Sequence, residues 1–97
     1  GKWTVREVLG HLGDSERVLA YRALSIARGE AGPLPPFDHD AWVPAGEFES
    51  RRLDDVLGEL FAVRAATVEL VRGLPEAAVA RAGVVGTTRT TVAALLY

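Results

Sequence analysis

The residues best suited to metal chemistry lie on one stripe of the first predicted helix. His11, Ser15, Val18 and Arg22 are spaced at i, i+4, i+7 and i+11, so a helix would stack them on one side. A neutral imidazole is a common metal ligand, but on spacing alone a single histidine beside an apolar face is more typical of a structural hydrogen bond. The spacing therefore predicts a polar margin that can face a cleft.

The second histidine lies in an aromatic loop segment, residues 37–42, which reads FDHDAW. His39 stands there between Asp38 and Asp40. An Asp-His-Asp triplet in a loop is typical of a helix cap with solvated neighbours, and this interpretation is favoured over a metal ligand. The aromatic side chains indicate that the loop packs against the protein.

Two charged residues occupy positions where apolar side chains are expected. Glu16 lies in the middle of an apolar arc on the first long helix, and Arg64 lies in a similar arc on the second. The first arc contains Val5, Val8, Leu9, Leu12, Leu19, Ala23, Ile26 and Ala27, and the second contains Leu53, Val56, Leu57, Leu60, Phe61, Val63, Thr67, Val68 and Val71.

A buried charge is costly unless it is paired, so we expect a buried Glu16–Arg64 pair. Loss of Arg64 would then strand Glu16 and cost about 3 kcal/mol or more. The alternatives are that the two charges only specify helix register, or that Arg64 extends outward along its aliphatic stem.

Capping and breaking residues predict where the first long helix begins and ends. Thr4 as N-cap and Glu7 three residues later form a capping box, so the helix should begin at about Val5. It should end at about Arg28, before glycines and prolines that cannot continue it. The following segment, residues 32–46, holds four prolines and two glycines and is expected to be an ordered loop with one short helical turn.

A second long helix is predicted from about Arg52 to Arg72, with Ser50 as an N-cap and Gly73 and Pro75 as the stop. Residues 75–80 could add one helical turn. Residues 83–89 are expected to form a connector without a long strand. Thr90 or Thr91 would then cap a third helix that starts near Val92.

Composition limits the chain to one small domain. It has 97 residues, 48% of them hydrophobic, and a net charge of -2 with its 11 basic residues scattered. We therefore expect neither nucleic acid nor a membrane as partner, because there is no basic patch and no spanning apolar run. The absence of cysteine excludes a thiolate metal cluster and favours a cytoplasmic location. The lack of methionine and the abrupt ends predict truncation at both ends.

Several segments resemble landmarks of DinB-like proteins, in the same order along the chain. Residues 2–12, KWTVREVLGHL, with the following 14–18 and 21–22, resemble the second helix of that family. Residues 37–42, 63–67, 74–76 and 91–97 look like its later landmarks. The resemblance covers nearly the whole chain.

The resemblance implies an all-α fold, part of an up-down-down-up four-helix bundle with a proline-rich ordered loop between the two long helices. It also implies a divalent metal, zinc or nickel, held by one histidine of the second helix and by an H-x-x-x-H pair of the fourth. His11 matches the first ligand. Because no H-x-x-x-H occurs here, residues 1–97 are expected to be a partial domain that lacks the family's first helix and most of its last.

Related enzymes use such a metal to activate a low-molecular-weight thiol, as in bacillithiol- and mycothiol-dependent transferases, or are described as hydrolases. The resemblance therefore implies a bacterial transferase or hydrolase that acts on a small-molecule thiol or electrophile, as a homodimer. Arg22 would hold a substrate carboxylate, and Asp38, Asp40 and Trp42 would line the cleft. The alternatives are a non-catalytic stress-associated binding protein on the same scaffold, or a helical fragment that dimerises to cover its apolar faces.

Overall fold

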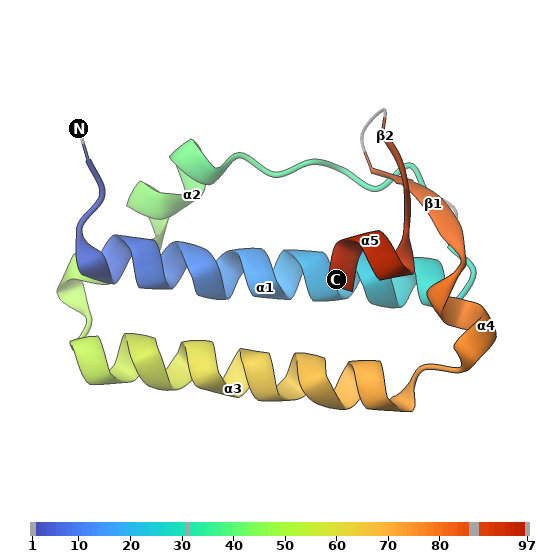
Figure 1. Cartoon of the computed structure of the whole chain (residues 1–97). Helices are drawn as coiled ribbons and strands as arrows, with labels where there is room; N and C mark the ends of the chain where they lie inside the picture. Colours follow the sequence, from blue (N-terminus) through green and yellow to red (C-terminus); the bar gives the residue numbers. More distant parts are fainter. Residues whose placement is uncertain (1, 31, 86–87, 97) are drawn as a thin grey trace.

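The computed structural model describes residues 2–30, 32–85 and 88–96 (Figure 1). It is mostly helical, as predicted, with one short hairpin. The elements in chain order are α1 (Val5–Ala27), α2 (His39–Gly46), the 3-10 helix η1 (Phe48–Ser50), α3 (Leu53–Gly73), α4 (Glu76–Val79), β1 (Ala82–Val85), β2 (Thr88–Thr91) and α5 (Val92–Leu96). Within these ranges, no helix combines the length and apolar character needed to cross a membrane.

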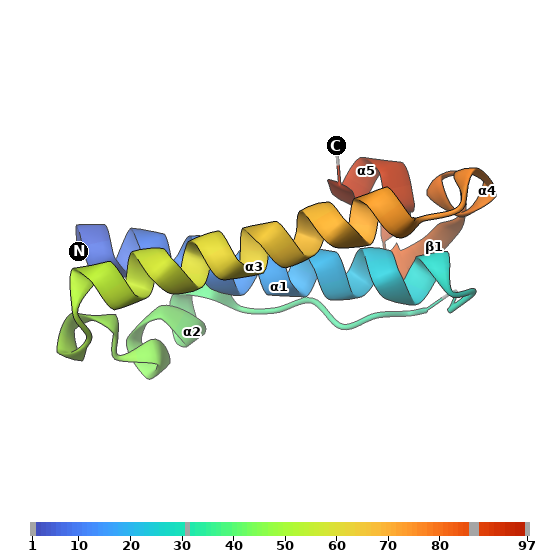
Figure 2. The same ribbon diagram turned by 90° about the horizontal axis from the view of Figure 1, so that it is seen from below.

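The two long helices, α1 and α3, lie side by side and run in the same direction (Figures 1 and 2). Residue numbers increase together across the pair: Arg6 of α1 bonds to Arg51, just before α3, and Glu16, further along α1, contacts Arg64 of α3. Two consecutive parallel helices need a long return connection, and the proline-rich segment with α2 supplies it along the flank of α1. The last helix, α5, runs back in the opposite direction against α1 (Figure 1).

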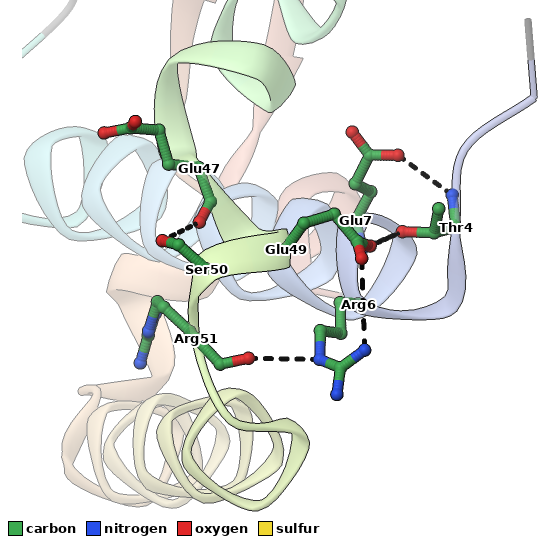
Figure 3. A network of polar contacts seen from close by, with 7 residues as sticks. All are labelled: Thr4, Arg6, Glu7, Glu47, Glu49, Ser50 and Arg51. Carbon is green, nitrogen blue, oxygen red and sulfur yellow. Dashed lines mark hydrogen bonds and ion pairs between the residues drawn. The ribbon is translucent and has the colours of Figure 1, made fainter.

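Polar contacts tie the beginning of α1 to the end of this return connection (Figure 3). The predicted capping box of Thr4 and Glu7 is present. The Thr4 hydroxyl also donates to Glu49, and Arg6 Nε donates to the Arg51 carbonyl oxygen at 3.0 Å. The starts of α1 and α3 are therefore held together by residues that also cap the first helix.

The predicted N-cap of α3 is wrong. Arg52 occupies the N-cap position without a side-chain hydrogen bond, and the Ser50 hydroxyl instead donates to the Glu47 carbonyl oxygen at 2.7 Å. The intervening 3-10 turn, η1, takes Ser50 out of reach of the helix start.

The core surrounds the C-terminal half of α1 and is narrower than the predicted arcs. It comprises Ala23, Ile26, Ala27, Leu34, Ala78 and Val92. By contrast, Val5 is 68% exposed and Phe61 is 67% exposed, and Val8, Leu12, Leu53 and Val68 are also exposed. On α3 the buried side chains are Val56, Val63 and Thr67, a stripe that one neighbouring helix, α1, can cover.

The connector predicted at residues 83–89 has no long strand, as expected, but its described residues belong to two short strands, which corrects the all-α expectation. β1 and β2 pair antiparallel, with Val84 opposite Arg89. The Leu34 amide donates to the Val84 carbonyl oxygen at 2.7 Å and joins the proline-rich segment to the same hairpin. Gly32, with a φ of 97°, permits this approach because a Cβ there would overlap the Val84 backbone. Strands of four residues are too short for a clear alternating pattern, although their valines and threonines favour strand.

The Glu16–Arg64 pair exists, but it is not buried. Arg64 Nη1 lies 2.9 Å from Glu16 Oε1, with the Glu16 side chain 17% exposed and the Arg64 side chain 67% exposed. Arg64 reaches outward along its aliphatic stem, the alternative considered above, so that its guanidinium stays in water.

Replacing Arg64 with leucine should therefore lower the free energy of unfolding by only about 1 kcal/mol, because water screens the guanidinium. Urea unfolding of Arg64→Leu measures this effect. Arg72→Leu, which removes the exposed partner of Glu69 on the same helix, is the matched control. A loss near 3 kcal/mol for Arg64→Leu alone would contradict the exposed geometry and restore the buried pair.

The ring of Phe48, which is 6% exposed, lies against two glycines, Gly10 of α1 and Gly46 of α2. A Cβ at Gly10 would overlap this ring, whereas a Cβ at Gly58 of α3 would meet no atom within 4 Å. Gly10→Ala should therefore destabilise the protein by about 1 to 2 kcal/mol, because the overlap outweighs the better helix propensity of alanine.

Gly58→Ala is the matched control and should stabilise by about 0.5 to 1 kcal/mol. Thermal unfolding followed by circular dichroism compares the two variants. A stabilised Gly10→Ala variant would show that Phe48 does not pack against this glycine.

Candidate functional site

His11 lies at the junction of three segments. It projects from the second turn of α1. The centre of its ring lies 4.9 Å from that of Trp3, which precedes the helix, and 4.9 Å from that of His39 at the start of α2. The two imidazole planes meet at 81°. Ser15, one turn along α1, has its Oγ 3.4 Å from the ring nitrogens of His11. The structure thus brings the two histidines of the chain together.

The aromatic contacts continue from His39 into the return connection. The ring centres of Phe37 and His39 are 4.4 Å apart, and those of Phe37 and Trp42 are 4.9 Å apart. Arg22 Cζ lies 5.5 Å from the centre of the Phe37 ring, within the range of a cation–π contact. His11, Arg22 and Trp42 therefore belong to one cluster, which extends through Phe37 and His39.

Asp38 caps α2, as the sequence interpretation favoured. Its Oδ1 accepts hydrogen bonds from the Asp40 amide at 3.0 Å and from the Ala41 amide at 3.3 Å. Asp40 is exposed in the first turn of α2. Neither carboxylate is among the described residues that line the cavities beside this cluster. The role of Asp38 in the structure is to fix the beginning of α2, and with it His39.

Two cavities flank residues 35–37 of the return connection, which lie beside α1. The first, the Tyr21 cavity, has a volume of about 410 Å³ and is lined by Asp14, Arg17, Val18, Tyr21, Arg22, Leu34, Pro35, Pro36, Phe37 and Trp42. The second, the His39 cavity, has a volume of about 510 Å³ and is lined by Ser15, Leu19, Arg22, Pro36, Phe37, His39, Val85, Thr88, Thr90 and Leu95. Mostly apolar walls with a few polar groups are typical of small-molecule sites.

Arg22 belongs to the walls of both cavities. Its Nη2 donates to the Pro35 carbonyl oxygen at 3.0 Å, which attaches the loop to α1. Its Nε is buried and, within the described part of the chain, has no hydrogen-bond partner. A buried donor without an acceptor is costly, so an anionic ligand that reached this atom would gain a strong hydrogen bond.

The pKa values of two neighbouring carboxyl groups, those of Asp14, which lines the Tyr21 cavity, and Glu59, are shifted in opposite directions. Burial raises the pKa of Asp14, and the nearby Glu59 carboxylate adds to this effect, while Arg17 and His11 oppose it. Hydrogen bonds from Arg17 and then from Arg51, whose Nη1 lies 2.6 Å from Glu59 Oε1, lower the pKa of Glu59.

The described residues supply part of a metal site. They contain no group of three histidine, aspartate or glutamate side chains arranged to hold an ion. His11 and His39 together offer two imidazoles, which are ligands that zinc and nickel accept. The donor type fits such a metal, and further ligands would have to come from elsewhere.

The proximity of His39 to His11 was missed by the sequence interpretation, which treated the former as a neighbour of a helix cap. The concentration of aromatic residues in the loop was the available signal, because it indicated packing onto α1. It could not indicate which turn of α1 the loop would contact, since that depends on the path of the whole return connection.

The two carboxyl groups should affect stability in opposite directions. The raised pKa of Asp14 means that the folded state favours its protonated form, so its contribution to stability is present at low pH and is lost as pH rises through the folded pKa. Asp14→Asn should therefore raise the free energy of unfolding at pH 7. This gain should vanish at pH values below the ordinary pKa range of carboxyl groups.

The lowered pKa of Glu59 means that its contribution is present above its ordinary pKa and is lost as pH falls through the folded one. Glu59→Gln should therefore lower stability at pH 7, with the deficit shrinking in acid. Urea unfolding of both variants and the parent between pH 3 and pH 7 tests this, at roughly unit steps. Effects of the same sign at pH 7 would contradict the assignment.

Comparison with known proteins identifies the family of the chain. The DinB superfamily matches over residues 1–97. No curated protein and no solved structure matches the chain. The match extends over all of the elements that surround His11, from the capping box of α1 to the start of α5. The chain therefore belongs to the DinB superfamily.

Proposed function

We propose that the protein is a metal-dependent enzyme in which His11 binds a divalent ion, zinc or nickel, and which transfers a low-molecular-weight thiol to an electrophile or hydrolyses a small substrate. The observation that carries this proposal is the placement of His11 beside His39, which lines a cavity together with Arg22. This combination offers a metal ligand, a donor for a substrate anion and space for a small molecule within one site.

The arrangement of the helices supports the proposal. α1 and α3 run parallel and α5 runs back against α1, the order expected for the second, third and fourth helices of an up-down-down-up bundle. Ala94 and Leu95 of α5 line a space with Glu16 and Leu19 of α1. The axis of α5 is thus directed along α1 towards the half that carries His11, and the family pattern assigns the further histidine ligands to this last helix.

When bound, a zinc or nickel ion would act as a Lewis acid that lowers the pKa of a thiol or a water. The residues of the chain bind and orient the substrate around it. Arg22, which lines both cavities, would bind a substrate carboxylate, and Phe37 and Trp42 would provide apolar surface for the substrate body. The Ser15 hydroxyl, one turn from His11, orients the imidazole through its contact with the ring nitrogens.

Metal content tests this proposal directly. The natural full-length protein, purified, exposed to Zn²⁺ or Ni²⁺ and desalted, should retain about one ion per protein, and its His11→Ala variant should retain almost none. Ser25→Ala, further along the same helix, is the matched control and should bind as the parent does. Circular dichroism verifies that all three proteins are folded. Unchanged metal content in His11→Ala would show that His11 is not a metal ligand and would contradict the proposal.

A further inference from the structure

We infer that His39 is a second ligand of the metal at His11, so that the ion bridges α1 and α2. This inference rests on the proposed metal site. It adds to that site a residue from the return connection, outside the helices to which the family pattern assigns its ligands. The chain contains two histidines, and they come from separate elements to lie with their ring centres 4.9 Å apart.

The separation of the rings suits a shared ion. A histidine nitrogen lies about 2.0 to 2.1 Å from zinc, and the centre of its ring lies about 1.2 Å further out, so two imidazoles at a near-tetrahedral angle have ring centres about 5 Å apart. The observed 4.9 Å agrees with this value. The separation of the ring centres therefore allows both imidazoles to bind one ion once a nitrogen of each is turned towards it.

The position of His39 is fixed by the fold. It is the first residue of α2, whose N-terminus is capped by Asp38 and whose C-terminal Gly46 lies against the Phe48 ring. That ring also contacts Gly10, the residue before His11. The Phe48 ring thus packs against both α1 and α2 and holds the two helices close together. A site built on such fixed elements loses little entropy when it binds an ion.

The surroundings leave the pair accessible. His39 is exposed to solvent and lines the His39 cavity together with Ser15 and Arg22. An ion held by His39 would therefore lie beside a cavity in which a small molecule could approach it. Coordination positions open to such a molecule distinguish a metal site that accepts an exogenous ligand from a closed structural one.

Edge-to-face packing of two aromatic rings would give a similar separation, so the experiment must separate ligation from packing. His39→Phe retains a ring but has no nitrogen, and His39→Gln removes the ring while keeping polarity. The matched control is Glu47→Gln, at the other end of α2, which is exposed and changes a local charge. Co²⁺ is the probe, because its visible absorption reports coordination by nitrogen ligands, and Zn²⁺ competition then yields the affinity of the closed-shell ion.

Both His39 variants should bind Co²⁺ and Zn²⁺ about 10- to 100-fold more weakly than the parent, while Glu47→Gln should be unchanged. In the parent, addition of Zn²⁺ should shift the ¹⁵N resonances of both imidazoles. In His39→Phe the remaining His11 resonance should shift only at higher Zn²⁺ concentration.

The possible results separate this inference from the proposal on which it rests. Parent-like affinity in both His39 variants, together with lost binding in His11→Ala, would overturn the role of His39 and leave the metal site at His11 intact. Parent-like affinity in His11→Ala, or no binding of Co²⁺ and Zn²⁺ by the parent, would overturn both. Weakened binding in His39→Gln but not in His39→Phe would show that the ring contributes by packing, and would also overturn ligation.

Discussion

The ring of Phe48 lies between the backbones of Gly10 and Gly46, and the placement of the site depends on this contact. Each glycine lacks the one carbon that would hold the ring away, so η1 and α2 both approach α1 closely. The capping contacts of Thr4 and Arg6 reinforce the same corner by joining the start of α1 to Glu49 and Arg51. As a result, His39 lies beside the turn of α1 that carries His11.

The parallel direction of α1 and α3 explains why a site can form at this place. An antiparallel pair could be joined by a short loop, but a parallel pair requires a connection that returns along the full helix length. Here that connection is rich in proline and aromatic residues, so it packs along α1 without forming a third long helix. The cavities arise on either side of it, where its Pro36 and Phe37 side chains lie beside Arg22 of α1.

Local signals in the sequence predicted most of the helical elements. The capping box at Thr4 marked the start of α1, and Thr91, whose Oγ1 accepts from the Ala94 amide at 3.1 Å, marked the start of α5. These motifs act within a few residues of themselves, so they can be recognised without knowledge of the tertiary structure. The hairpin was missed because its short strands are stabilised by the core contact of Val85 and by the bond from Leu34, both non-local.

The site was only partly predictable for the same reason. His11 and Arg22 could be placed on one stripe because helix geometry is regular, and Glu16 was correctly matched with Arg64 because opposite charges on apolar faces attract. The exposure of Arg64 and the approach of His39 depend on how wide the helix interface is and where the loop crosses. Those quantities are set by packing around Phe48 and the glycines, which the periodicity of the helices does not encode.

The segment across α1 is attached at both ends, by the Leu34 amide to the hairpin and by Phe48 to α1 and α2, with Arg22 bonded to Pro35 between them. A segment held at three points cannot move far from α1. Pro36 and Phe37, which lie between two of these points, contribute to the walls of both cavities. The three attachments therefore set the distance between these walls and Arg22, so that loosening any one of them would change the shape of both cavities.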